Sequence, residues 1–176
     1  MWGSDLIAET IRAAGFRFAA VNPGASYRGL HDSLVNYPQG KLDLITILHD
    51  EHAVAVAHGW TKVTDEPALA MLHANVGLMH AVMAIHNAWV DRAPVVILGA
   101  SGAMDAMKRR PWIEWIHSMQ DQAALVRPFL KWDDQPGSAP AAARAIAEAR
   151  FRSGAVPQGP SYVVMDVDYQ ETELDS

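Results

Sequence analysis

The stretch His49-Asp50-Glu51-His52 places two carboxylates between two imidazoles, a combination of groups that can move protons. An apolar run, residues 44–48, leads into it and is typical of a buried strand, and the small residues that follow are typical of a helix. Ligands bind at the carboxyl ends of the strands in an open α/β sheet. Alanines and valines follow Glu51, and a carboxyl group in apolar surroundings keeps its proton to a higher pH. We therefore expect Glu51 to share or donate a proton.

The same two acids also have a purely structural interpretation. Asp50 can serve as a helix N-cap, because its side chain accepts a hydrogen bond from a free amide of the first turn. Glu51 is then an ordinary first-turn acid that the helix dipole favours. The residue types alone leave both interpretations open.

Other kinds of site are weakly supported. His49, His52 and His58 are neighbours, but His52 and His58 are six residues apart and do not share a helix face, so we expect no metal site. The chain has no cysteine and therefore neither disulfides nor thiolate ligands. The sequence also lacks the glycine-rich dinucleotide fingerprint, the nucleotide phosphate loop and the Gly-x-Ser-x-Gly elbow.

The composition and charge limit the classes of protein to which this chain can belong. The chain has 176 residues, of which 50% are hydrophobic, enough for one domain with a sizeable core. The formal net charge of −6 argues against a nucleic-acid partner, and the basic run at residues 108–110 is expected to be a solvated loop. Neither a signal-like start nor a long apolar span is present, so we expect a soluble, cytoplasmic protein without a membrane partner.

Strand and helix patterns alternate along the chain. Strands are expected at residues 16–21, 42–48, 68–72, 93–99, 129–132 and 161–167, and helices at 5–14, 28–35, 51–63, 77–89 and 140–152, with a short one at 119–125. The prediction is an α/β fold with a doubly wound, about six-stranded parallel sheet and helices on both faces. Residues 1–167 form the expected domain, and 168–176 a tail or the start of an interdomain linker. Residues 101–118 look irregular, with Trp112 and Trp115 as expected anchors.

A set of short motifs along the chain resembles the amino-terminal, pyrimidine-binding domain of thiamine-diphosphate-dependent enzymes. Within that superfamily the chain is most similar to benzoylformate decarboxylase, related 2-oxo-acid decarboxylases and acetolactate-synthase-like enzymes. The matching residues are Asn22-Pro23-Gly24, Glu51 with Ala55, Gly59 and Trp60, Pro67, Leu72-His73-Ala74 with Gly77, Asn87-Ala88-Trp89, residues 93–96, Arg127-Pro128, Lys131-Trp132 and residues 157–160 with Tyr162.

The resemblance implies roles for individual residues. It implies that Glu51 holds N1′ of the cofactor's aminopyrimidine and that His73 is an active-site histidine that relays protons. It places Pro23 and Gly24 beside the pyrimidine, and His80 in the altered loop at the cofactor. His73 also has a purely structural interpretation, as a histidine whose hydrogen bonds are made to nearby backbone. Pro23-Gly24 can likewise be a simple turn.

The substrate-facing pair is Ala25 and Ser26. Benzoylformate decarboxylase has a serine directly after the Pro-Gly pair, where this chain has Ala25. A substrate pocket for a 2-oxo acid other than benzoylformate is therefore expected.

Half of such an active site is absent from the sequence. The family's diphosphate-binding domain carries a Gly-Asp-Gly motif that holds Mg²⁺ on the diphosphate, and this chain has no Gly-Asp-Gly. The resemblance therefore implies a partner domain or subunit, an oligomer of like or unlike chains, and either a split enzyme or a piece of a longer one. Two other hypotheses stay open: a non-catalytic interaction module that keeps the fold, and a flavodoxin-like binding protein for another ligand.

Overall fold

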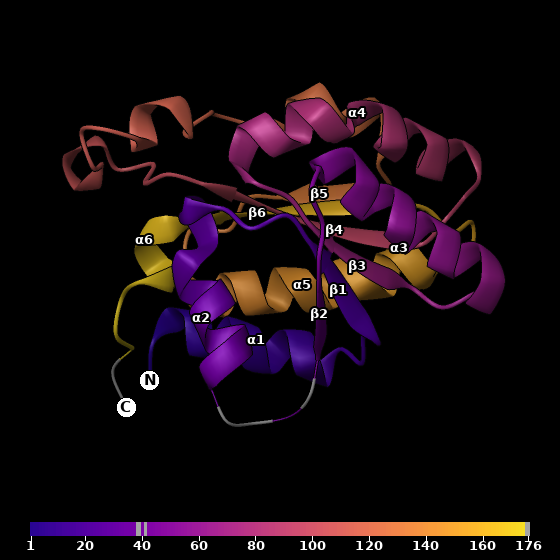
Figure 1. Ribbon diagram of the computed structural model, residues 1–176, viewed down its shortest axis with the longest axis horizontal. Helices are drawn as coiled ribbons and strands as arrows, with labels where there is room; N and C mark the ends of the chain where they lie inside the picture. Colours follow the sequence, from indigo (N-terminus) through magenta and orange to yellow (C-terminus); the bar gives the residue numbers. More distant parts are fainter. Residues whose placement is uncertain (38–39, 41, 175–176) are drawn as a thin grey trace.

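The computed structural model describes residues 1–37, 40 and 42–174 and contains one central sheet (Figure 1). All the pairings in this sheet are parallel, and the six strands lie in the order β2-β1-β3-β4-β6-β5. The strands are β1 (Phe18–Val21), β2 (Asp43–Thr46), β3 (Ala68–Met71), β4 (Val95–Ser101), β5 (Trp132–Asp134) and β6 (Ser161–Asp166). The expected α/β fold with a parallel sheet is confirmed.

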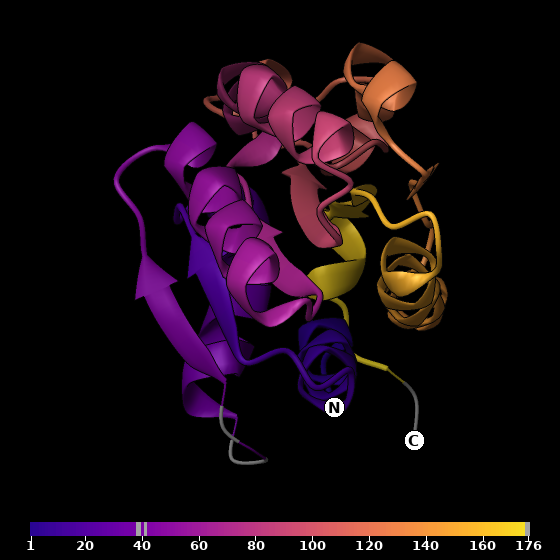
Figure 2. The ribbon, with the colours of Figure 1, turned by 90° about the vertical axis from the view of Figure 1, so that its right-hand side faces the viewer.

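Helices cover both faces of the sheet (Figures 1 and 2). One face carries α1 (Gly3–Ala13), α2 (Arg28–Asn36), α5 (Ala139–Gly154) and the short α6 (Val167–Gln170). The other face carries α3 (Asp50–Thr64) and α4 (Ala74–Val90), which pack side by side. The bounds of α1 to α5 agree with the expected helices to within a few residues, whereas α6 was not expected. The doubly wound arrangement is also confirmed.

The central strands divide the core into two layers because successive side chains of a strand point to opposite faces. In β3, Leu69 and Met71 pack toward α1 and α5, whereas Ala70 packs toward α3 and α4. Every residue of β1, β3 and β4 is buried. Near-continuous burial is what a parallel sheet with two covered faces requires.

One expectation about the strands is wrong. The strand that leads to the acidic pair, β2, was expected to be buried, but it is an edge strand with mostly exposed side chains. Ile45 is 42% exposed and Leu48, just beyond the strand, is 95% exposed. The apolar run indicated a strand correctly, but an apolar run does not say whether a strand has one neighbour or two.

The carboxyl-terminal segment packs on the domain. The expected tail or linker, residues 168–176, starts inside α6, where Tyr169 and Gln170 are buried. Further along, the backbone N–H of Leu174 donates to the carbonyl of Met1 at 2.8 Å. Residues 175–176 lie outside the described part of the chain, and the proposed start of a linker stays a prediction.

The segment after β4 is irregular, as expected, and consists of turns and four short 3₁₀ helices between Ala106 and Phe129. Its expected anchors are wrong, because Trp112 and Trp115 are 74% and 69% exposed. His117 and Gln122 are among its buried residues, and the Gln122 amide donates to the carbonyl of Ala100 at 3.0 Å. Of the helices that the structure describes, none is both long and apolar enough to cross a membrane.

Candidate active site at the switch point of the sheet

The sheet has a topological switch point between β1 and β3. Strand β2 lies on one side of β1 and strand β3 on the other, so the winding reverses at this place. The loops that leave the carboxyl ends of β1 and β3 diverge there, and ligands of open α/β sheets bind in the crevice between such loops. The predicted site residues come from these two loops and from the start of α3, which follows β2.

Asp50 joins the two loops. Its carboxylate accepts a hydrogen bond from the side-chain amide of Asn22, after β1, at 2.7 Å. It accepts a second from the backbone N–H of His73, after β3, also at 2.7 Å. Asp50 is only 5% exposed. The N-cap interpretation of Asp50 is wrong, because His49 is the N-cap residue of α3 and the Asp50 carboxylate bonds across the crevice instead.

A buried tyrosine stabilises the loop after β1. The hydroxyl of Tyr27, which is fully buried, donates to the carbonyl of Asn22. Burial, with the nearby Asp50 charge as a smaller contribution, raises the pKa of Tyr27 far above its ordinary value, so the hydroxyl stays a donor. Pro23 is exposed at the tip of this loop.

Gly24 lies directly against His73. A Cβ atom on Gly24 would sit 2.1 Å from Cδ2 of the imidazole, so only glycine allows the two loops to approach this closely. The sequence placed both residues at the site, and the structure brings them into contact.

His73 is half-buried at the N-cap of α4, and its ring lies between Gly24 and His117. The ring centroids of His73 and His117 are 4.9 Å apart, with the planes tilted by 32°. Nε2 of His73 is buried and has no hydrogen-bond partner among the described residues. Burial, followed by the proximity of His117, lowers the pKa of His73, and Asp50 opposes this shift.

The first turn of α4 is strained and tightly packed. Ala74 has a φ of 48°, in the left-handed region that costs energy for alanine. The backbone N–H of Gly77 donates to the carbonyl of His73 at 2.6 Å, and a Cβ on Gly77 would lie 2.2 Å from Oδ1 of Asp50. Gly77 thus lets α4 start beside the Asp50 carboxylate.

Glu51 stands next to Asp50 but in a different environment. It is half-buried in the first turn of α3, and no hydrogen bond or ion pair joins its carboxylate to another described residue. The nearby imidazoles form a loose group, with His49 4.9 Å from the exposed His80 and 5.4 Å from His52, measured between ring centroids.

His58 does not join this imidazole group. It pairs with Asp91, where Nε2 lies 3.1 Å from the carboxylate. Within the described residues, no three His, Asp or Glu side chains are grouped so as to hold a metal ion.

The two residues expected to face a substrate differ in exposure. Ala25 is exposed, whereas Ser26 is 2% exposed and its carbonyl accepts a hydrogen bond from Gln170. Of this pair, Ala25 is therefore the one open to a ligand.

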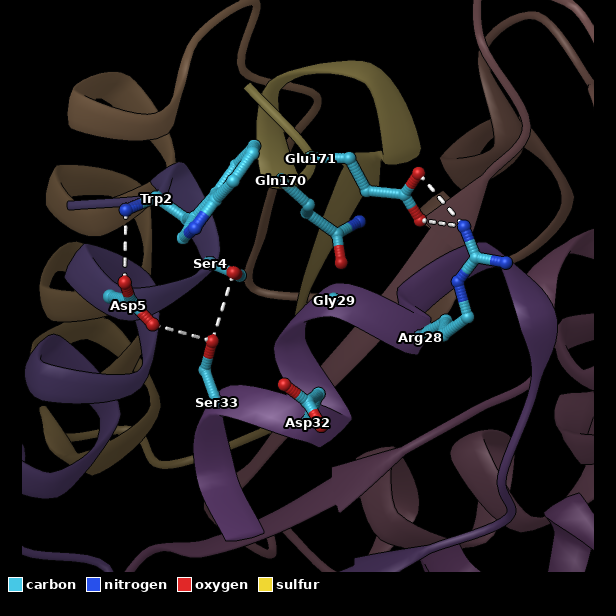
Figure 3. A pocket seen from close by; sticks show the side chains of 9 residues that line it. All are labelled: Trp2, Ser4, Asp5, Arg28, Gly29, Asp32, Ser33, Gln170 and Glu171. Atoms are coloured by element: carbon cyan, nitrogen blue, oxygen red, sulfur yellow. Dashed lines mark hydrogen bonds and ion pairs between the residues drawn. The ribbon is translucent and has the colours of Figure 1, made fainter. Parts of the chain in front are cut away.

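A surface hollow of about 470 Å³ lies elsewhere, where α1, α2 and α6 meet (Figure 3). Its wall includes the indole of Trp2, the Asp5–Ser33 hydrogen bond and the ion pair of Arg28 with Glu171. None of the predicted site residues lines it. We assign the site to the switch point because the unpartnered imidazole nitrogen, the strained backbone and the bridging carboxylate all occur there.

Comparison with known proteins finds related chains. A benzoylformate decarboxylase from Pseudomonas aeruginosa is 27% identical over 160 residues, which cover 91% of this chain and 29% of that protein. An acetolactate synthase large subunit from Mycobacterium tuberculosis is 26% identical over 172 residues, covering 96% of this chain and 29% of that protein. The chain thus spans less than a third of these relatives.

A solved structure has the same fold over the whole chain. It is the thiamine diphosphate-dependent 4-hydroxybenzoylformate decarboxylase of Rhodococcus jostii, with a TM-score of 0.85 and 24% identity, covering 100% of this chain and 32% of that one. The family described as "Thiamine pyrophosphate enzyme, N-terminal TPP binding domain" matches residues 1–125. The chain therefore belongs to this family of amino-terminal, pyrimidine-binding domains of thiamine diphosphate enzymes.

Proposed function

We propose that this chain is the pyrimidine-binding half of a thiamine-diphosphate-dependent 2-oxo-acid decarboxylase or carboligase. The observation that carries the proposal is the arrangement at the switch point, where Asp50 joins the loop after β1 to the loop after β3 and Gly24 contacts His73. Glu51 is the next residue of α3. Thiamine diphosphate supplies an electron sink for making or breaking a carbon–carbon bond next to a carbonyl.

The residues of the crevice suit an aminopyrimidine ring. Such a ring offers hydrogen-bond donors and acceptors along its edge, and the residues at the switch point include a half-buried carboxylate, that of Glu51, and a half-buried imidazole, that of His73. Gly24 lets His73 come close to the loop after β1, so that both can border one ligand. Pro23 and His80 are exposed at the rim and would complete the contacts.

Each side chain has a distinct task in this proposal. Glu51 holds a proton at N1′ of the pyrimidine and thereby activates the cofactor. His73 accepts or returns a proton at the reacting substrate. In the same proposal, Ala25 borders the substrate. Ser26 stabilises the loop that carries Ala25, because its carbonyl accepts a hydrogen bond from Gln170.

Asp50 is the competing candidate for the proton on N1′. Asp50 is buried and Glu51 only half-buried, but the Asp50 carboxylate already binds Asn22 and His73, whereas the Glu51 carboxylate has no partner among the described residues. A carboxylate that must exchange a proton with a ligand needs a free oxygen, and this favours Glu51.

The rest of the active site lies outside this chain in our proposal. The diphosphate and its Mg²⁺ require a second domain, on a longer form of this chain or on a partner subunit. The functional unit is then an oligomer that closes the crevice between the two halves.

Mass spectrometry on protein from its natural source tests the proposal. A longer polypeptide, or a 19.2 kDa chain that comes with a second polypeptide, Mg²⁺ and thiamine diphosphate, is the expected result. The same chain without any cofactor or partner domain would contradict it and favour a non-catalytic interaction module. In the complete assembly, Glu51→Gln separates the two further: it abolishes the activity of an enzyme, but it leaves the partner binding of a module intact.

A further inference from the structure

His117 is a buried histidine that the sequence did not single out. It belongs to the irregular segment after β4, it is 7% exposed, and its carbonyl accepts the backbone N–H of Gly102 at 3.0 Å. Its Nδ1 lies 3.0 Å from the carbonyl oxygen of Ile113. A carbonyl oxygen only accepts, so Nδ1 carries a hydrogen and the ring is fixed in orientation.

The fixed ring of His117 lies on His73. The centroid distance of 4.9 Å and the tilt of 32° place the two imidazoles partly face to face. Gly24 closes the other side of His73, where a Cβ would collide with Cδ2. His73 is therefore held between a glycine backbone and a second imidazole, with its buried Nε2 left unpartnered.

The charges around His73 come from two elements. His117 approaches from the segment after β4, and Asp50 from α3, where its carboxylate accepts the backbone N–H of His73. The loop after β1 brings only Asn22, Pro23 and Gly24, which do not titrate. Two imidazolium ions at this separation repel each other, so proximity to His117 opposes protonation of His73, and burial acts in the same direction.

We propose that His117 is a positioning residue for His73: its fixed ring holds the His73 imidazole against Gly24 and keeps it neutral, so that His73 remains able to accept a proton. This inference rests on the proposed function for its catalytic meaning, because that function makes His73 the residue that exchanges a proton with the substrate. The geometry of the pair itself does not depend on any ligand.

NMR titration of the histidine ring protons in the 176-residue chain tests the pair without a cofactor. In the wild type, His73 should titrate below the ordinary histidine range. His117→Phe keeps an aromatic ring beside His73 but removes the second imidazole, so the pKa of His73 should rise. His52→Phe is the matched control, because its ring lies near His49 and not near His73; it should leave the His73 titration unchanged.

Two outcomes of the NMR titration would contradict the proposal. A His73 that titrates in the ordinary range in the wild type, or identically in the wild type and in His117→Phe, would contradict it. If His117→Phe fails to fold, His117→Gln replaces it, because a glutamine amide can still donate to the Ile113 carbonyl.

In a complete enzyme, His117→Phe should also move the acid limb of the kcat/KM profile to higher pH. If thiamine diphosphate did not bind, the proposed function would be wrong, but the titration result would still hold.

Discussion

The Asp50 carboxylate accepts the backbone N–H of His73 at 2.7 Å and so ties the start of α3 to the end of β3. Its other oxygen accepts the side-chain amide of Asn22 and thereby reaches the end of β1. One buried carboxylate thus connects the loops on both sides of the switch point. This side-chain bridge adds to the backbone hydrogen bond by which the N–H of Asn22 binds the carbonyl of Met71 at 3.1 Å.

Asp50→Asn should destabilise the fold. The new amide group cannot accept on both sides, so it leaves either Asn22 or the His73 N–H without its acceptor in a buried place. We expect a loss of about 1–3 kcal/mol in the free energy of unfolding, which urea denaturation followed by circular dichroism measures. Glu51→Gln is the matched control on the adjacent residue, and an equal loss in both variants would contradict the bridging role of Asp50.

Glu51→Gln should instead act on catalysis. Glu51 makes no hydrogen bond or ion pair to another described residue, so the change should leave the free energy of unfolding within about 0.5 kcal/mol. In an assembly that contains the diphosphate-binding domain, we expect the rate to fall by roughly 10²–10⁴-fold, the usual loss for a missing acid or base. Retained activity in Glu51→Gln, together with lost activity in a folded Asp50→Asn, would transfer the role to Asp50.

Gly24→Ala should displace His73. The added methyl group would lie 2.1 Å from Cδ2 of a ring that His117 prevents from moving away. We expect a destabilisation of about 1–3 kcal/mol and a change in the His73 ring signals in NMR spectra. Gly59→Ala is the contrasting control, because nothing lies within 4 Å of the added atom inside α3. It should stabilise the chain by roughly 0.5–1 kcal/mol.

Much of the fold was predictable because it depends on local patterns. The bounds of α3 and α4 and the strands β3 and β4 follow from apolar periodicity and from the residues that end each element. The exposure of β2 was not predictable in this way, since its position at the edge depends on the order of strands. Order is a property of the whole sheet, and no residue of β2 encodes it alone.

The candidate site likewise has parts that local patterns predicted and parts that they did not. His73 and Gly24 were placed at strand ends by local motifs, and the structure brings them into contact. The bridge through Asp50 spans 28 residues to Asn22, and no local pattern distinguishes it from an N-cap. His117 was missed because it lies in an irregular segment, where the more conspicuous residues, Trp112 and Trp115, turned out to be exposed.

Stability should rise with pH on the acid side of neutrality because of His73. Burial and His117 lower its pKa in the folded state below the ordinary value of 6.5. Between those two pKa values the unfolded chain binds a proton that the folded chain does not, so acid favours unfolding. The free energy of unfolding should therefore fall as pH drops below about 6.5 and level off once folded His73 is also protonated.

Urea denaturation at a series of pH values checks this dependence. His73→Gln removes the titrating group and should flatten the pH profile in that window. His80→Gln removes an exposed histidine and should change the slope little. A profile with the same slope in the wild type and in His73→Gln would show that other groups cause the acid sensitivity.

The 176-residue chain by itself should bind thiamine and thiamine diphosphate about equally weakly and should release no carbon dioxide from 2-oxo acids. The reason is that the crevice offers contacts for the pyrimidine end only, whereas the diphosphate needs a domain that we place outside the chain. Calorimetric titration with the two compounds compares their affinities directly, because they differ only in the diphosphate. Much tighter binding of thiamine diphosphate would mean that this chain holds the diphosphate itself, and decarboxylation by the chain alone would mean that its active site is complete.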